Sequence, residues 1–288
     1  MSDYKMITDS ACDLPQAMLR ELDVTVVPLR LLFRGENIPD SVEDEKIREI
    51  YRGLRAGEDA KTSVANPQGW ASVMEPILAA GQDILALTFS SGLSTTYQSA
   101  VIAAADLLEK YPQRKIRVVD TLAAALGQGL LVWYTCQKRD QGLSLEELTA
   151  WVEGHKRNLA HWFTVDDLMY LKRGGRISAA TALVGTLLQI KPVLFVDHEG
   201  HLISVAKARG RKAALSMLVR KLVELGEGFD QEMVFICHGD CIEDARIVED
   251  MVRAQTGTKN IMVGNLGAVI GSHAGPGTVS LFFMGKAR

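Results

Sequence analysis

Short apolar runs alternate with amphipathic segments through the first half of the chain. Apolar runs that end at polar residues predict strands at residues 4–10, 24–33, 83–89 and 115–120. Helical periodicity covers residues 43–56, 95–111 and 122–138, and Asp13-Leu14-Pro15 is typical of a helix start. Alternating strands and helices imply parallel strands with crossover helices. The first half is therefore predicted to be an α/β/α unit with a parallel sheet.

The second half contains the same patterns in a less regular order. Strands are predicted at residues 159–165, 191–197, 201–208, 232–239, 259–266 and 278–284, and helices at 144–157, 177–189, 211–226 and 241–255. The turn at residues 197–200 is so short that the runs on either side should form a hairpin, which makes this sheet mixed. We therefore expect two α/β domains, residues 1–158 and 159–288.

Composition narrows the class of protein. The 288 residues suit two domains of ordinary size, and 47% apolar with 23% charged residues is usual for a soluble globular protein. A net charge of -3 gives no electrostatic argument for a nucleic-acid partner. Three aspartates occupy the first 15 residues, where a signal peptide would be apolar, and no apolar run approaches the ~20 residues that cross a bilayer. We expect a cytoplasmic protein without a transmembrane segment.

The cysteines give little support for a disulfide framework or a metal site. Four cysteines are few for this length. Cys237 and Cys241 flank a histidine in "CHGDC", but a zinc site needs further Cys or His ligands at fixed spacings, and none follow closely. Buried thiols at a strand end are the simpler interpretation, so neither a metal nor another cofactor is expected.

A hydroxyl-rich turn, residues 90–94, follows the apolar run in "LALTFSSGLSTTYQSA" (85–100). Such a turn could hold a nucleophile, bind an anion or cap the next helix. The G-x-S-x-G pattern of a nucleophile elbow is absent around Ser90, although His273 could act as a base. Hydroxyls and free N–H groups at a helix N-terminus suit a carboxylate or phosphate. A serine-type acyl hydrolase or transferase using this turn and His273 remains the alternative.

Other polar residues fall where an α/β sheet binds ligands, beyond the carboxyl ends of strands. They are Thr8-Asp9-Ser10, Asp120-Thr121, and Thr62-Ser63 ahead of a helix that opens at Asn66-Pro67. His273 is predicted to lie in a glycine-rich loop, a backbone suited to tight turns and close approach of a ligand. Each polar turn could merely cap a helix, but several on one edge favour a polar pocket.

Two basic clusters, residues 172–176 and 207–212, occur in the second half. Neither matches the G-x-x-x-x-G-K-[ST] phosphate loop, so an ATP site in this chain is poorly supported. These residues are either solvated charge near helix ends or a contact for phosphate or an acidic partner surface.

Seven segments together resemble the DegV family, the fatty-acid-binding (FakB-type) subunits of bacterial fatty acid kinase. They are, in order, "ITDSACDL" (7–14), "TSVANP" (62–67), "SSGLSTTYQSA" (90–100), "VVDTL" (118–122), "VDDLMYLKRGGRIS" (165–178), "LLQIKPVL" (187–194) and "GAVIGSHAGPGT" (267–278). The resemblance implies a two-domain α/β fold with one long-chain fatty acid between the domains. It also implies a separate ATP-binding kinase protein that phosphorylates the carboxylate. Transient contact with a membrane is compatible with this function.

The resemblance assigns site residues by position. The carboxylate would be bound at Thr62, Ser94 and His273, with Ser63, Thr95 and Gly275 beside them. Arg173 and Arg209 would lie near the carboxylate and the kinase, and the tail would lie along helices at 122–134 and 177–190. The family pattern T-S-Q-P is replaced here by Thr62-Ser63-Val64-Ala65, and its glycine after G-L-S is Thr95. No catalytic residue is assigned to this chain.

Overall fold

The first half forms a parallel four-stranded sheet, as its sequence pattern predicts. The computed structural model describes residues 4–40, 42–178, 190–226 and 233–288. Strands β1 (Tyr4–Asp9), β2 (Val24–Val27), β6 (Asp83–Thr88) and β7 (Ile116–Asp120) lie in the order β2-β1-β6-β7, all parallel.

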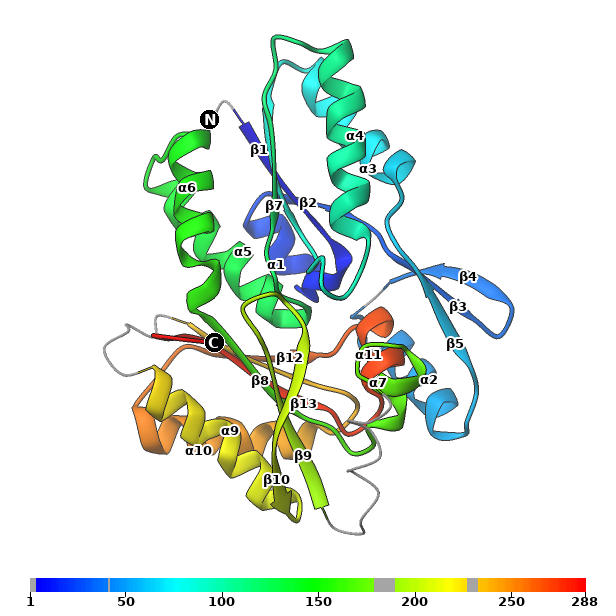
Figure 1. Cartoon of the computed structure of the whole chain (residues 1–288), viewed down its shortest axis with the longest axis vertical. Helices are drawn as coiled ribbons and strands as arrows, with labels where there is room; N and C mark the ends of the chain where they lie inside the picture. The colour runs from blue at the N-terminus through cyan, green and yellow to red at the C-terminus, as the bar shows by residue number, and fades with distance from the viewer. Residues whose placement is uncertain (1–3, 41, 179–189, 227–232) are drawn as a thin grey trace.

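Helices cover both faces of this sheet (Figure 1). Helices α3 (Pro67–Ala79) and α4 (Thr96–Lys110) pack on one face. Helices α1 (Gln16–Glu21), α5 (Ala125–Asp140) and α6 (Leu145–His155) pack on the other, and short 3-10 turns η1 (Ser10–Cys12) and η2 (Lys156–Asn158) follow β1 and α6. The arrangement is the predicted α/β/α sandwich.

The second half forms the predicted mixed sheet. Its strands are β8 (Leu159–Thr164), β9 (Ile190–Val196), β10 (Leu202–Arg209), β11 (Val234–His238), β12 (Ile261–Asn265) and β13 (Val279–Met284), in the order β10-β9-β8-β13-β11-β12. Strands β11 and β12 are parallel, whereas the other pairs are antiparallel, including the predicted β9–β10 hairpin. Helices α9 (Arg211–Leu225) and α10 (Ile242–Thr256) cover one face.

Helix α5 joins the two sheets. It contacts β6 of the first sheet and β8, β11 and β13 of the second, so it lies between them (Figure 1). One hydrophobic cluster runs continuously through this contact, from Leu87 of β6 past Leu130 of α5 to Phe282 of β13. The two sheets therefore share a core through α5, and a domain boundary at residue 158 stays a prediction.

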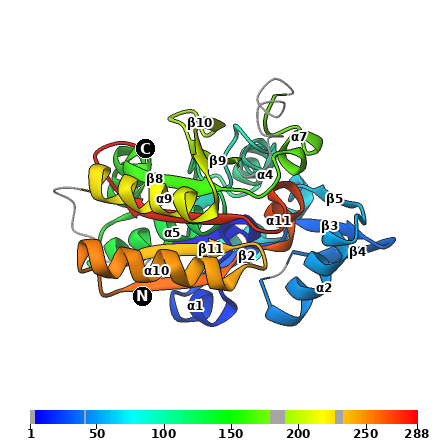
Figure 2. The same cartoon turned by 90° about the horizontal axis from the view of Figure 1, so that it is seen from below.

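A third, antiparallel sheet was not anticipated. Residues 24–33 were expected to be one extended run, but Pro28 separates β2 from β3 (Arg30–Phe33), which pairs with β4 (Glu36–Pro39) and β5 (Ala60–Ser63). Proline cannot donate to a sheet ladder, so the chain leaves the parallel sheet there. Helix α2 (Asp44–Arg55) lies between β4 and β5 in the chain, and Figure 2 shows this group at the side of the molecule.

The predicted loop around His273 is in fact a short helix, α11 (Ala268–Ala274), packed against α7 (Met169–Arg173). A helix this short is marginal alone. Its first N–H groups are held by carboxylates, because Gly267 N donates to Asp13 Oδ2 at 2.9 Å and Val269 N to Asp40 Oδ1 at 2.9 Å. The loop prediction was wrong because these bonds come from residues more than 200 positions away. The helix predicted at 177–189 lies, from residue 179 on, outside the described residues.

Candidate functional site

A cavity of about 580 Å³ lies where β5, the 90–94 turn, the start of α5, β8, α7, α11 and β13 meet. Ligand pockets in proteins typically span about 300–1,000 Å³. Much of the wall is apolar, and it includes Leu29, Phe89, Phe163, Leu202, Leu266 and Ile270. The space therefore suits a largely apolar ligand with polar contacts at selected points.

One end of the cavity carries a hydroxyl–imidazole pair. Thr62 Oγ1 and His273 Nε2 are 2.8 Å apart and share a hydrogen bond, although they come from β5 and α11. Burial, and to a lesser extent the positive charge of Arg176, lower the pKa of His273 to about 4. The imidazole is therefore neutral at pH 7 and can take part in hydrogen bonds without carrying charge.

Arg176 supplies positive charge at the same end. It lines the cavity and is half-buried, and its guanidinium donates to the carbonyl oxygens of Leu93, at 3.2 Å, and of Gly174. Burial lowers its pKa from the usual value. Among the residues that the structure describes, no carboxylate lies within ion-pair distance of this cation. Arg176 belongs to the basic cluster at 172–176 ("KRGGR"), but no site role was predicted for it.

Gly174 makes room for the His273 ring. A Cβ atom at this position would overlap His273 Nδ1 and lie 3.1 Å from its Cγ. Only glycine therefore allows the α7 end to approach the imidazole this closely. The paired glycines of "KRGGR" were the signal in the sequence, but their neighbour could only be identified in three dimensions.

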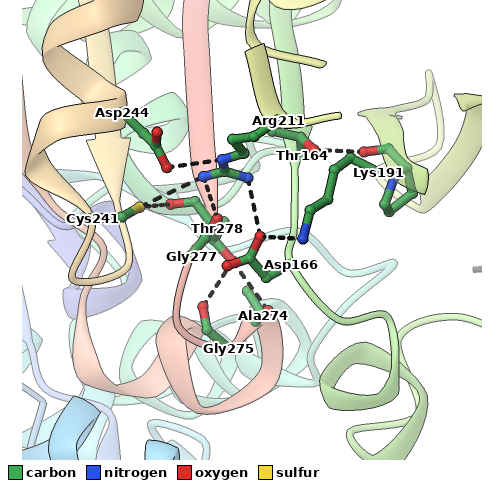
Figure 3. A network of polar contacts seen from close by, with 11 residues as sticks. Thr164, Asp166, Lys191, Arg211, Cys241, Asp244, Ala274, Gly275, Gly277 and Thr278 are labelled. Atoms are coloured by element: carbon green, nitrogen blue, oxygen red, sulfur yellow. Dashed lines mark hydrogen bonds and ion pairs between the residues drawn. The ribbon is translucent and has the colours of Figure 1, made fainter. Parts of the chain in front are cut away.

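A network of polar contacts fixes the chain that follows His273 (Figure 3). Arg211 Nη2 donates to Gly277 O at 2.6 Å while its Nε donates to Asp244 at 2.8 Å. The Cys241 thiol donates to Thr278 O at 3.3 Å, and Thr278 Oγ1 donates to Gly275 O at 2.8 Å. Arg211, part of the basic cluster at 207–212, is thus bound within the protein and supports the segment that carries His273.

The 90–94 turn contacts the β9–β10 hairpin and so holds the two halves of the chain together. Ser90 is fully buried, and its hydroxyl donates to Gly200 O in the β9–β10 hairpin at 3.0 Å. A Cβ on Gly92 would lie 2.9 Å from Glu199 O, so the two turns are in close contact. The Ser90 hydroxyl also accepts from Gly92 N at 3.2 Å, so it closes its own turn as well as binding the hairpin.

The serine-hydrolase alternative finds no support in this geometry. Ser94 lines the cavity, but its hydroxyl lies 2.8 Å from Thr96 Oγ1 and accepts from Thr96 N at 3.2 Å. His273 Nε2 faces Thr62 instead of a serine of the turn. A nucleophile needs a base within hydrogen-bond reach. Within the described residues, no serine of the turn is hydrogen-bonded to His273.

The polar turns at residues 8–10 and 120–121 hold the backbone and, unlike Thr62-Ser63, do not line the cavity. Buried Asp9 accepts from Phe89 N at 2.7 Å, and Asp120 accepts from Ser91 N at 3.1 Å. Burial raises the pKa of Asp9 to about 7. Asp9 and Asp120 therefore fix the backbone where the 90–94 turn begins.

The remaining predicted site residues divide into two groups. Ser63 and Arg173 line the cavity, and the Arg173 guanidinium lies 4.6 Å from the centre of the Tyr170 ring. Three others lie outside the cavity wall: Thr95 is exposed at the start of α4, Gly275 caps α11 with φ +85°, and Arg209 is exposed on β10.

The described residues offer neither a metal site nor a membrane-spanning helix. Cys237 is buried, and burial raises the pKa of its thiol well above the usual value. Among the described residues, no group of three or more His, Cys, Asp or Glu side chains is placed to hold a metal ion. None of the helices in the described ranges is long and apolar enough to cross a membrane.

Comparison with known proteins places the chain in a family. The family model described as "Uncharacterised protein, DegV family" matches residues 3–286. A DegV domain-containing protein of Clostridium perfringens is 43% identical over 289 residues, covering 100% of this chain and 99% of that protein. The chain belongs to the DegV family.

Solved structures show the same fold. A DegV family protein from Thermus thermophilus, described as fatty-acid-binding, is 34% identical with a TM-score of 0.85, covering 98% of this chain and 99% of that one. A DegV lipid-binding protein from Thermotoga maritima is 28% identical with a TM-score of 0.86, covering 100% of both chains. The sequence-based fold class is thereby confirmed.

Proposed function

We propose that this protein binds one long-chain fatty acid between its two halves and presents the carboxylate to a separate ATP-dependent kinase. The observation that carries the proposal is the polar end of the cavity. There, Arg176 without an acidic partner among the described residues lies beside the Thr62–His273 pair, at the edge of an otherwise mostly apolar space. The fatty-acid-binding relative of similar fold supports the same ligand class.

The carboxylate would bind to Thr62, Ser94, His273 and Arg176. A hydrogen bond to a charged group contributes about 1.5–3 kcal/mol, more than one between neutral groups. The acyl tail gains ~0.8 kcal/mol per buried methylene, so a long chain gains on the order of 10 kcal/mol before ordering costs. The tail therefore supplies most of the affinity, and the polar end fixes which way the ligand points.

Two exposed arginines, Arg173 and Arg209, support the proposed presentation of the carboxylate to a kinase. Arg173 lies at the cavity wall with its side chain exposed, and Arg209 is exposed on β10. In the proposed reaction a carboxylate oxygen attacks the γ-phosphorus of ATP held by the kinase, giving an acyl phosphate and ADP. This chain would hold the carboxylate in place and contact the kinase, which the family resemblance implies is a separate ATP-binding protein.

Titration with oleate and palmitate, followed by native mass spectrometry and calorimetry, tests fatty-acid binding. His273→Ala should weaken binding by about 10- to 100-fold, because it removes a polar contact to a charged group. His201→Ala is the matched control, since His201 is an exposed histidine outside the cavity. If the wild type takes up neither acid, or if both variants bind equally well, the proposal fails.

Adding the kinase and ATP, with hydroxylamine to trap acyl phosphate, tests presentation. Arg209→Ala should lower acyl-phosphate formation more than it lowers fatty-acid affinity, because Arg209 lies outside the cavity wall. Equal effects on both measurements would remove its role at the kinase contact.

A further inference from the structure

A second histidine lies in the cavity wall, away from the polar end. His161 is in the middle of β8 and is only 5% exposed. Its Nδ1 atom has no hydrogen-bond partner among the described residues. The carboxylate site proposed at Thr62 and His273 does not involve this imidazole.

The strand register shows how far His161 lies from the His273 end. Thr164 is opposite Val279, where β13 begins after α11, and His161 is opposite Phe282, three residues further on. At about 3.3 Å per strand residue, His161 is roughly 10 Å deeper along the sheet than that end. An acyl chain bound as proposed, with its carboxylate at Thr62 and His273, would therefore pass His161 with its hydrocarbon part.

The surroundings of His161 are apolar. Its ring centre lies 4.4 Å from that of Phe282 and 5.6 Å from that of Phe163. Gly127 of α5 lies next to Nδ1, because a Cβ added to Gly127 would be 3.4 Å from this nitrogen. Burial, helped by the positive charge of Arg288, lowers the pKa of His161 to about 3. The ring is thus a neutral polar group in a hydrophobic wall.

A neutral imidazole carries one N–H donor and one acceptor nitrogen. Nδ1 is covered beside Gly127 and has no partner in the described residues, so we assign the proton to Nε2, for which these residues also provide no hydrogen-bond partner. An unsubstituted acyl chain offers this N–H no acceptor, and a buried polar group without a partner is destabilising. An oxygen atom on the chain would give this Nε2 N–H an acceptor, while Nδ1 stays covered beside Gly127.

We propose that the cavity is built for an acyl chain with a hydroxyl group near its middle, and that His161 Nε2 donates a hydrogen bond to that oxygen. The inference rests on the proposed fatty-acid site and adds the chemical class of its ligand. His161 is then a specificity-determining residue, because it favours an oxygenated chain over a plain one of equal length.

The test compares stearate with hydroxystearates substituted at carbons 3, 7, 10, 12 and 17, using calorimetry on the wild type and on His161→Phe. The measured quantity is the affinity of each hydroxy acid divided by that of stearate, which cancels effects common to both ligands. At least one isomer substituted near the middle should lose about 5- to 10-fold in this ratio on His161→Phe, as expected for one hydrogen bond. The 3-hydroxy isomer should change little.

Two further variants separate polarity from shape. His161→Gln keeps an N–H donor and should retain part of the preference, whereas Phe163→Leu alters the same face without removing a polar atom and should leave the ratio unchanged. Thermal unfolding confirms that each variant is folded. An unchanged ratio for every isomer in His161→Phe overturns the inference even when stearate binds, and failure of stearate to bind the wild type refutes the proposed function instead.

Discussion

Two neutral histidines in the cavity wall, His273 and His161, have opposite surroundings. His273 shares a hydrogen bond with Thr62 and lies near the cation Arg176. His161 lies between aromatic rings, and its Nδ1 has no hydrogen-bond partner within the described ranges. We therefore propose that the same type of side chain binds an anion at His273 and a neutral oxygen at His161, because the neighbouring residues decide which ligand atom fits.

The largest expected effect comes from crowding the His273 end. Gly174→Ala places a Cβ on the His273 ring, so the imidazole must move away from Thr62. Overpacking of this kind costs about 1–3 kcal/mol, and we expect roughly 10- to 100-fold weaker oleate binding by calorimetry.

Gly154→Ala is the control for Gly174→Ala. Gly154 lies in α6 with no atom near its added Cβ, so this change should leave oleate binding intact. Equal affinities in Gly174→Ala and the wild type would show that the imidazole is free to shift.

Lowering the pH should reduce the free energy of unfolding, because His161 is buried in its neutral form. Its pKa is about 3 in the folded protein, against 6.5 for an unperturbed histidine, so between these values the unfolded chain binds a proton that the folded chain does not. The stability from this group is present above about pH 6.5 and is lost as the pH falls toward 3. Relative to His161→Phe, the wild type should lose up to about 1.4 kcal/mol of unfolding free energy per pH unit in that range.

Urea denaturation between pH 7 and 4 measures this difference. Asp9 acts in the opposite sense: its raised pKa of about 7 gives stability that is present at low pH and lost as the pH rises. Its contribution is common to both proteins and cancels. Parallel stability curves for wild type and variant would contradict the burial of a neutral His161.

The smallest effect is expected from crowding the His161 end. Gly127→Ala puts a Cβ 2.8 Å from the edge of the buried Phe282 ring, so the ring must shift slightly. Alanine also favours the α5 helix by about 0.5–1 kcal/mol over glycine, which offsets the crowding. Calorimetry should show a loss of at most about threefold for stearate and none for laurate, whose shorter tail ends earlier. A uniform loss for both acids would place Gly127 beside the carboxylate.

Most of the regular elements could be predicted from hydrophobic periodicity. Strands β6 and β7 and helices α4 and α9 begin and end within two residues of the expected positions. Their patterns are strong because each buries one continuous face. The β3-β4-β5 sheet and α11 were missed, since short elements that depend on distant partners carry little periodic signal.

The candidate site was only partly accessible from the sequence. The family resemblance pointed to Thr62, Ser94 and His273, and the structure brings all three to one cavity. Thr95, Gly275 and Arg209 lie outside its wall, while Arg176, Gly174 and His161 were not singled out. Sequence spacing could not identify Arg176, Gly174 and His161, because their importance depends on the residues that surround them in the folded protein.

The sequence by itself determined the α/β class, the parallel and mixed sheets, the hairpin and the family, because these follow from local periodicity, turn length and ordered motifs. Only the tertiary structure decided that Ser90 binds Gly200 of the hairpin and that Thr62 meets His273. It also left His161 Nδ1 without a partner among the described residues. Hydrogen bonds and burial depend on atoms that are far apart in the chain, and folding alone brings those atoms together.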